Sequence, residues 1–100
     1  MVKYIGQFKN NIRDGKGIYY WNSGNRYEGD WKNDLKGGKG IFYGNDDDRY
    51  EGDWKNDKIE GKGIYYYNNG NREMGDYIND NKIWSHTILY HNGKFEAKHY

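Results

Sequence analysis

Three histidines are the first residues to test for chemistry, because imidazole is a common metal ligand and proton carrier. His86, His91 and His99 are separated by 5 and 8 residues. These spacings match no zinc signature, and the chain has no cysteine to complete a site or to form a disulfide. We therefore expect no metal site and no cofactor.

The carboxylates offer two other kinds of chemistry. The run Asp46-Asp47-Asp48 has the oxygen ligands that calcium prefers, but it lacks the ligand pattern of a calcium loop, and we interpret it as a solvated turn. Asp30 and Asp53 have the residue type of an acid–base pair. They recur by repetition, however, and each lies beside a lysine, so cross-strand ion pairing explains them better. The lysines expected as partners are Lys16, Lys39 and Lys62. No catalytic constellation remains, and we expect no enzyme activity.

These residues recur because the chain repeats. Tyr27-Glu28-Gly29-Asp30-Trp31 returns as Tyr50-Glu51-Gly52-Asp53-Trp54, and the offset is 50 − 27 = 23 residues. Weaker copies stand one step before, at Tyr4-Ile5-Gly6-Gln7-Phe8, and one step after, at Glu73-Met74-Gly75-Asp76-Tyr77. A fixed period in this range indicates a repeat array. We divide the chain into one domain, residues 1–100, with units 4–26, 27–49, 50–72 and 73–95 and a partial unit 96–100.

Each unit is predicted to form a β-hairpin. Tyr27, Gly29 and Trp31 alternate with charged residues, which places the rings on one face of a strand and the charges on the other. Asn33-Asp34 predicts a turn, and Gly38-Lys39-Gly40-Ile41-Phe42-Tyr43 the second strand. The sequence therefore predicts an all-β chain: a single-layer antiparallel meander of about nine strands, roughly 40 Å long at about 4.8 Å per strand.

Composition and charge exclude several classes of function. Aromatic residues make up 19% of the chain, which argues for a folded protein despite an apolar share of only 34%. The net charge is +1 and the signs are interleaved, so no basic stripe points to nucleic acid. No apolar run reaches the roughly 18 residues of a membrane span. The first repeat begins at once without a signal-peptide core, so we expect a cytoplasmic protein.

Glycines inside strands need a reason, because they weaken a strand. We expect a missing side chain to leave room for a ring from the next unit. The glycines given this structural role are Gly29, Gly38, Gly40, Gly52, Gly61 and Gly63. In the fourth unit Trp84 and His86 replace two of these glycines. We interpret this as capping, since no further ring needs the space; a degenerate repeat without a capping role is the alternative.

The repeated rings are the candidate partner-binding residues. They are Tyr27, Trp31, Tyr50, Trp54 and Tyr77. Two roles remain open for each ring, core alone or core plus a partner surface, because one sheet cannot bury both of its faces. The excess of aromatic residues favours some partner-facing surface.

These residues carry a resemblance to a known family. Tyr-Glu-Gly-x-Trp followed by Gly-x-Gly-x-aromatic, at a period of 23, resembles the MORN repeat (membrane occupation and recognition nexus) over nearly the whole chain, in about four units. One departure is consistent, since the family often has glycine where this chain has Asn11, Asp34, Asp57 and Asp80. These residues tolerate left-handed backbone, so the turn survives. The resemblance implies an elongated, twisted sheet that serves as a scaffold or docking surface; some members have been proposed to bind phospholipid.

We expect a non-catalytic scaffold or adaptor that binds protein partners in a larger assembly through its aromatic face or a sheet edge, and self-association is an open alternative. Heavy use of Asn, Lys, Tyr and Ile suggests an AT-rich genome such as that of a ciliate, so a cytoskeletal or ciliary assembly is the expected setting. Peripheral phospholipid binding is the second hypothesis, weakened by the alternating acids. Carbohydrate binding is the third, since aromatic hairpin repeats of similar length occur in cell-wall-binding modules.

Overall fold

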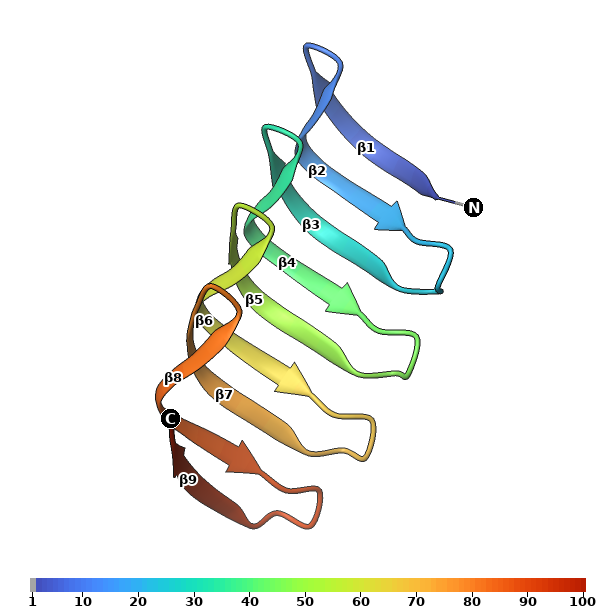
Figure 1. The fold of residues 1–100 in the computed structure, drawn as a ribbon. Helices are drawn as coiled ribbons and strands as arrows, with labels where there is room; N and C mark the ends of the chain where they lie inside the picture. The colour runs from blue at the N-terminus through green and yellow to red at the C-terminus, as the bar shows by residue number, and fades with distance from the viewer. Residues whose placement is uncertain (1) are drawn as a thin grey trace.

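The computed structural model describes residues 2–100 and has one open antiparallel sheet whose nine strands follow each other in chain order (Figure 1). The strands are β1 (Lys3–Lys9), β2 (Ile12–Tyr20), β3 (Arg26–Lys32), β4 (Leu35–Tyr43), β5 (Arg49–Lys55), β6 (Lys58–Tyr66), β7 (Arg72–Ile78), β8 (Asn81–Leu89) and β9 (Phe95–His99). The described residues contain no helix, and so none that could span a membrane. The predicted all-β meander is confirmed, and the molecule extends 47 × 25 × 16 Å.

The turn inside each hairpin is built from two polar residues in left-handed backbone. Asn33 and Asp34 have φ of 49° and 72°, and Asn56 and Asp57 repeat this with 50° and 69°. Positive φ at both central residues is the geometry of a type I′ hairpin turn, which matches the twist of the flanking strands. The expectation that these turns survive without glycine is therefore confirmed.

A bulge bends every complete hairpin. In the β3–β4 pair, Gly29 lies opposite Gly40 but Trp31 lies opposite Lys36, so Asp30 alone faces the three residues 37–39. Gly38 in this bulge has a φ of 92°, which an L side chain rarely adopts. Bulges bend a strand and increase its twist, and Figure 1 shows the short-turn ends of the hairpins curling away from the main run of the strands.

The bend turns toward the aromatic face of the sheet and makes it concave. Lys36 lies beyond the bulge, yet its Nζ is within 5.7 Å of the ring centres of Trp21 and Tyr27, which precede it. We call this concave face, which carries Tyr27, Trp31 and their repeats, the aromatic trough. The opposite face, which carries Glu28, Asp30 and their repeats, is the outer face.

The core is a continuous row of rings along the floor of the trough. The Tyr27 ring lies edge-on to both Trp31 and Trp54, with 5.2 Å between centroids in each pair. The Tyr50 ring does the same with Trp54 and Tyr77 at 5.4 Å. Edge-to-face pairs contribute about 0.5–1.5 kcal/mol each beyond the area they bury. A single-layer sheet thus builds a core from contacts between consecutive hairpins.

Candidate docking face

The structure places all five predicted partner-binding rings in the core. Their exposed fractions are 0% for Tyr27, 4% for Trp31, 2% for Tyr50, 8% for Trp54 and 3% for Tyr77. A partner could reach them only after neighbouring side chains moved. A partner-facing role for these five rings therefore stays a prediction, whereas their core role follows directly from their burial.

Tyrosine and glycine fit together within each hairpin. The Tyr27 hydroxyl donates a hydrogen bond to the Asp30 carbonyl oxygen at 2.9 Å, and the ring lies so close to β4 that a Cβ on Gly40 would stand 2.1 Å from that hydroxyl. Tyr50 and Gly63 repeat the contact at 2.0 Å. The space left by these glycines is thus filled by a ring of the same hairpin, and the expectation of a ring from the next unit is wrong.

The other glycines have related roles. Gly29 and Gly52 lie against the partner strand and the same tyrosine hydroxyls, with a Cβ on either meeting backbone at 2.4–2.5 Å. Gly38 and Gly61 sit instead in the bulge, with φ of 92° and 101°, beside the carboxylates of Asp30 and Asp53. Backbone conformation, rather than room for a ring, requires glycine at these two positions.

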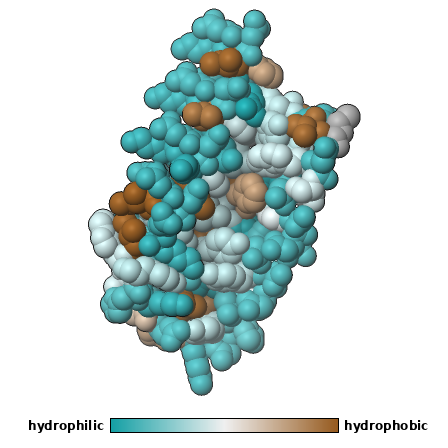
Figure 2. Space-filling model, in the orientation of Figure 1, coloured by the Kyte–Doolittle hydropathy of each residue, from teal (hydrophilic) through white to brown (hydrophobic). Residues whose placement is uncertain are grey.

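Above the buried row lies a second tier of half-buried side chains. Its rings are Tyr19, Trp21, Phe42, Tyr65 and Tyr67. The Lys36 Nζ lies 5.4, 5.7 and 5.3 Å from the ring centroids of Trp21, Tyr27 and Trp54, which is within cation–π range. Burial lowers the pKa of Lys36 below its ordinary value. Figure 2 looks onto this side of the molecule, where pale surface runs down the middle between mostly teal margins.

The fourth hairpin replaces the tyrosine–glycine fit with a buried ion-pair cluster. Position 73 is glutamate where earlier units have tyrosine, and position 86 is histidine where they have glycine. The His86 ring, 1% exposed, fills the space of the missing tyrosine, and its Nε2 lies 2.9 Å from the Asp76 carbonyl oxygen. This reproduces the bond that the Tyr27 hydroxyl makes to Asp30.

Glu73 is the centre of this cluster. Its Oε2 lies 2.8 Å from His86 Nδ1 and accepts a hydrogen bond from the Tyr100 hydroxyl at 2.7 Å, while its Oε1 accepts from Tyr67 and from Lys82 Nζ at 3.2 Å each. Burial alone would raise the pKa of Glu73, but the hydrogen bonds from Tyr100 and Lys82 and the charge of Lys82 hold it below its ordinary value. The carboxylate is therefore buried in its charged form and paired.

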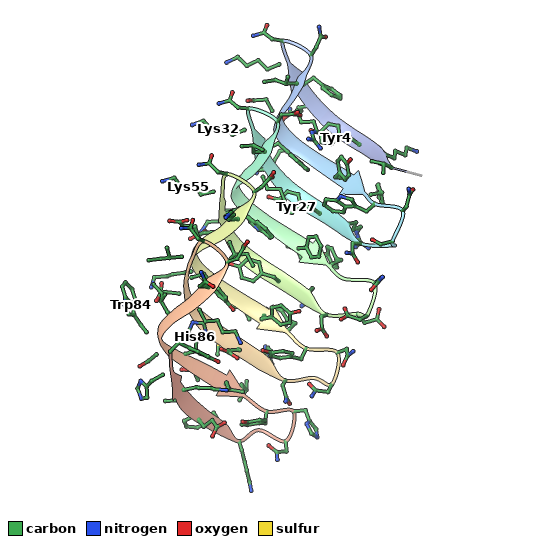
Figure 3. All side chains as sticks on the ribbon, viewed as in Figure 1. Tyr4, Tyr27, Lys32, Lys55, Trp84 and His86 are labelled. Atoms are coloured by element: carbon green, nitrogen blue, oxygen red, sulfur yellow. The ribbon has the colours of Figure 1, made fainter. Side chains whose placement is uncertain are left out.

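The capping interpretation of this unit needs correction. His86 does not occupy space that no ring needs; its own ring takes the place that a tyrosine fills elsewhere. Trp84 behaves differently, with a φ of 60° and an exposed fraction of 67%, and Figure 3 shows it pointing away from the sheet while His86 points into the trough. The sequence contains a signal that a glutamate–histidine pair replaces the tyrosine–glycine pair. Positions 73 and 86 both differ from the repeat pattern, and they are as far apart in the chain as Tyr27 and Gly40.

The outer face is lined by the predicted cross-strand ion pairs. Asp30 pairs with Lys16, Asp53 with Lys39, and Asp76 with Lys62 at 3.3 Å, which confirms ion pairing for Asp30 and Asp53. A shallow groove of about 780 Å³ follows the glycine row on this face. Its walls carry both acids and bases, together with Ile41, Ile64 and Met74. Lys16, Lys39 and Lys62 are thus neutralised, whereas Lys32 and Lys55, which point away from the trough in Figure 3, form no salt bridge among residues 2–100.

Among residues 2–100 there is no group of three or more histidine, cysteine or acidic side chains that could hold a metal ion. The run Asp46-Asp47-Asp48 forms a turn, in which Asp47 has a φ of 70° and the Asp46 carboxylate accepts from the Asp48 amide at 3.0 Å. Asp48 in turn accepts from the Asn68 amide at 2.7 Å. These carboxylates hold turns together between consecutive units.

An open sheet in strict chain order, with a core made by contacts between consecutive hairpins, defines this protein as a β-hairpin repeat array. A family model described as the MORN repeat matches three consecutive units, at residues 4–26, 27–49 and 50–72. The chain therefore belongs to the MORN-repeat family. The family is a non-catalytic repeat module found in protein-binding and membrane-binding contexts. A search of curated proteins found no match.

Proposed function

We propose that this chain is a non-catalytic scaffold or adaptor whose aromatic trough docks a protein partner. The observation that carries this proposal is the second tier of rings in the trough, which stays half-exposed although the ring row beneath it is buried. Trp21 is an example: its ring centre lies 4.6 and 5.6 Å from those of Tyr19 and Phe42, and the residue stays half-exposed. Aromatic and basic side chains together are the composition enriched at protein interfaces.

The binding surface is preformed. The rings of the second tier rest on the buried row, and Lys36 and Arg13 are fixed over rings by ion pairs to Asp57 and Asp34. A surface that is already ordered loses little side-chain freedom when a partner binds. Such rigidity suits a scaffold, whose role is to hold partners in place.

Membrane binding is the alternative, and the structure offers it less support. On the outer face, Lys16, Lys39 and Lys62 are each paired with an aspartate, whereas the exposed Lys32 and Lys55 form no salt bridge among the described residues. Binding to anionic lipid needs basic residues whose charge is not already neutralised, at about 1 kcal/mol each. Self-association stays a prediction that the size of the purified chain in solution would check.

The test is affinity purification of the tagged chain from its own cells, combined with flotation on anionic vesicles across a salt series. The proposal expects a protein partner at fixed stoichiometry and no flotation. Recovery of the chain alone, with flotation that falls as salt rises, would contradict it and favour the membrane alternative. We place the assembly in the cytoplasm, at the cytoskeleton or cilium, which imaging of the tagged protein would check.

A further inference from the structure

One unit of the aromatic trough has a vacant position that its neighbours fill. Residue 44 is glycine, whereas the equivalent positions of the other units carry Trp21, Tyr67 and Tyr90. Residue 59 is isoleucine, whereas Lys36 and Lys82 stand there in the units on either side. The site between β4, β5 and β6 therefore lacks both the ring and the cation of its neighbours, and a pocket of about 300 Å³ lies there. A pocket of about 290 Å³ also lies at the site bordered by Tyr67 and Lys82, so the Gly44 pocket differs in its lining and not in its volume.

The neighbouring units show what such a site holds. At the equivalent site between β2, β3 and β4, the Lys36 Nζ lies 5.4 Å from the Trp21 ring centre. At the equivalent site between β6, β7 and β8, the Lys82 Nζ lies 3.5 Å from the Tyr67 hydroxyl and 3.2 Å from the Glu73 carboxylate. Each filled site thus places a lysine ammonium beside a ring with a carboxylate in reach.

The vacant pocket keeps the walls that favour a cation. Phe42, Trp54 and Tyr65 supply rings, and ring faces attract an ammonium group. Because Lys36 Nζ already lies 5.3 Å from the Trp54 ring centre, Phe42 and Tyr65 are the rings left without a cation. Asp46 and Asp48 supply carboxylates, held by hydrogen bonds from the Asp48 amide at 3.0 Å and from the Tyr65 hydroxyl at 3.2 Å.

The charged side chains that face into the pocket are acidic. Neither Asp46 nor Asp48 takes part in a salt bridge within the described residues. Arg49 also borders the pocket, but its guanidinium lies 3.8 Å above the Tyr66 ring, which belongs to the outer face. The carboxylates therefore face the pocket without an internal cation.

We propose that this pocket, bordered by Gly44 and Ile59, receives a lysine side chain of the protein partner. The inference rests on the proposed function, since it names a side chain of the docked protein. The apolar stem of lysine fits against Phe42 and Ile59, and its ammonium meets the rings and the carboxylates of Asp46 and Asp48. The volume lies at the lower bound of ligand pockets, which suits a single side chain.

The test needs no partner. The purified chain is titrated with Nα-acetyl-lysine N-methylamide and separately with the norleucine analogue, which has the aliphatic stem without the charge. Amide and indole resonances followed by NMR report binding. The lysine probe is expected to shift Trp54 and residues 44–48 and to bind about tenfold more tightly than the norleucine probe. Equal affinities, or no saturable shift at these residues, would overturn the inference.

Two variants of one position separate the pocket from its backbone. Gly44→Tyr introduces the ring that Tyr67 and Tyr90 have, whereas Gly44→Ala adds only the Cβ. In both variants this Cβ would stand 2.6 Å from Asp46 Oδ1, so the Asp46 carboxylate must rotate equally in both, and the alanine variant controls for that movement. The tyrosine variant should bind the lysine probe about tenfold or more weakly than the alanine variant, which shares the same movement of Asp46. Equal binding by the two variants would contradict the assignment.

Ile59→Lys provides an independent check if Gly44→Tyr does not fold. This change supplies the cation that Lys36 and Lys82 provide in neighbouring units and should exclude the probe while leaving the backbone unchanged. A probe that still bound this variant unchanged would overturn the inference. The outcomes also separate the two proposals. Partner capture without probe binding removes the lysine pocket alone, whereas probe binding without a protein partner removes the docking function and, with it, the partner as the source of the lysine.

Discussion

Two types of residue position control how each hairpin folds: a position with no room for a side chain, and a position with left-handed backbone. Gly40 is of the first type, because the Tyr27 hydroxyl occupies the space of its Cβ. Gly38 is of the second, with a φ of 92°. Three earlier units place glycine in the left-handed bulge, and the fourth places Trp84 there with a φ of 60°. Both types can be tested by single substitutions.

Gly40→Ala should destabilise the fold by about 3 kcal/mol, because the new methyl group would stand 2.1 Å from the Tyr27 hydroxyl and the buried ring cannot move away. Thermal unfolding should show a melting temperature lower by more than about 10 °C. The matched control is Gly37→Ala, where the nearest atom is Lys32 Cβ at 3.7 Å. Similar melting temperatures for the two variants would show that the close fit is not what excludes a side chain at position 40.

Trp84→Gly should be more stable than Trp84→Ala by about 1 kcal/mol, because left-handed backbone strains any residue with a Cβ and glycine relieves this strain. Little packing is lost in either variant, since 67% of the Trp84 surface is already exposed. Chemical denaturation of the two variants gives the difference. An alanine variant as stable as the glycine variant would mean that the backbone at position 84 is not held in this conformation.

At the level of the hairpin, the fold depends on filling one space, and either strand can supply the side chain. Tyr27 fills it from β3, and His86 fills it from β8. Each donor bonds the carbonyl oxygen three residues after position 27 or 73: Asp30 lies within the bulge of its hairpin, and Asp76 is the first paired residue after the bulge. The exchange therefore keeps the hydrogen bond that holds the bend.

The combination Tyr27→Glu with Gly40→His should transfer the fourth-unit arrangement to the second unit. Gly40→His alone would overlap the Tyr27 ring, and Tyr27→Glu alone would leave a cavity beside a buried charge. The double variant should be more stable than either single variant, with a coupling of about 1–3 kcal/mol in a double-mutant cycle. If the losses of stability in the two single variants simply added in the double variant, histidine at position 40 would not replace the tyrosine ring at position 27.

Glu73 should make the fourth hairpin sensitive to acid. Its folded pKa is lowered, so its interactions stabilise the fold fully above the ordinary pKa of about 4.3 and are lost as pH falls through the folded pKa. The wild-type chain should therefore exceed Glu73→Gln in melting temperature at neutral pH, and the difference should shrink below about pH 4. A difference that stays constant from neutral pH to pH 3 would show that the carboxylate charge contributes nothing to stability.

The sequence predicted the hairpins well because their signals are local. Ring alternation, the Asn-Asp turns and the 23-residue period each act within one unit, and their strands appear where expected. The Glu73–His86 pair and the vacancy at Gly44 were not predicted. Both depend on which residues lie near each other on different strands. Comparing each position with the repeat pattern on its own does not show that two substitutions compensate for each other, or that together they leave a space open.

For the whole molecule, the central consequence is that a single-layer sheet has two very different faces. The outer face pairs three of its lysines with neighbouring aspartates, as for Lys62 and Asp76 at 3.3 Å. The aromatic trough buries one row of rings and leaves a second tier half-exposed, with Trp21 among its members. This difference is why we assign docking to the trough.

Two adjacent residues allow the faces to be compared directly. Trp21 lies in the trough, and Tyr20, which is 37% exposed and pairs with Arg26, lies on the outer face. The measurement that tests the docking function most directly is recovery of the co-purifying protein by the Trp21→Ala and Tyr20→Ala variants, with folding confirmed by thermal melting. We expect a loss of about tenfold or more in affinity for Trp21→Ala and little change for Tyr20→Ala. Equal recovery by both folded variants, or a loss confined to Tyr20→Ala, would contradict docking in the trough.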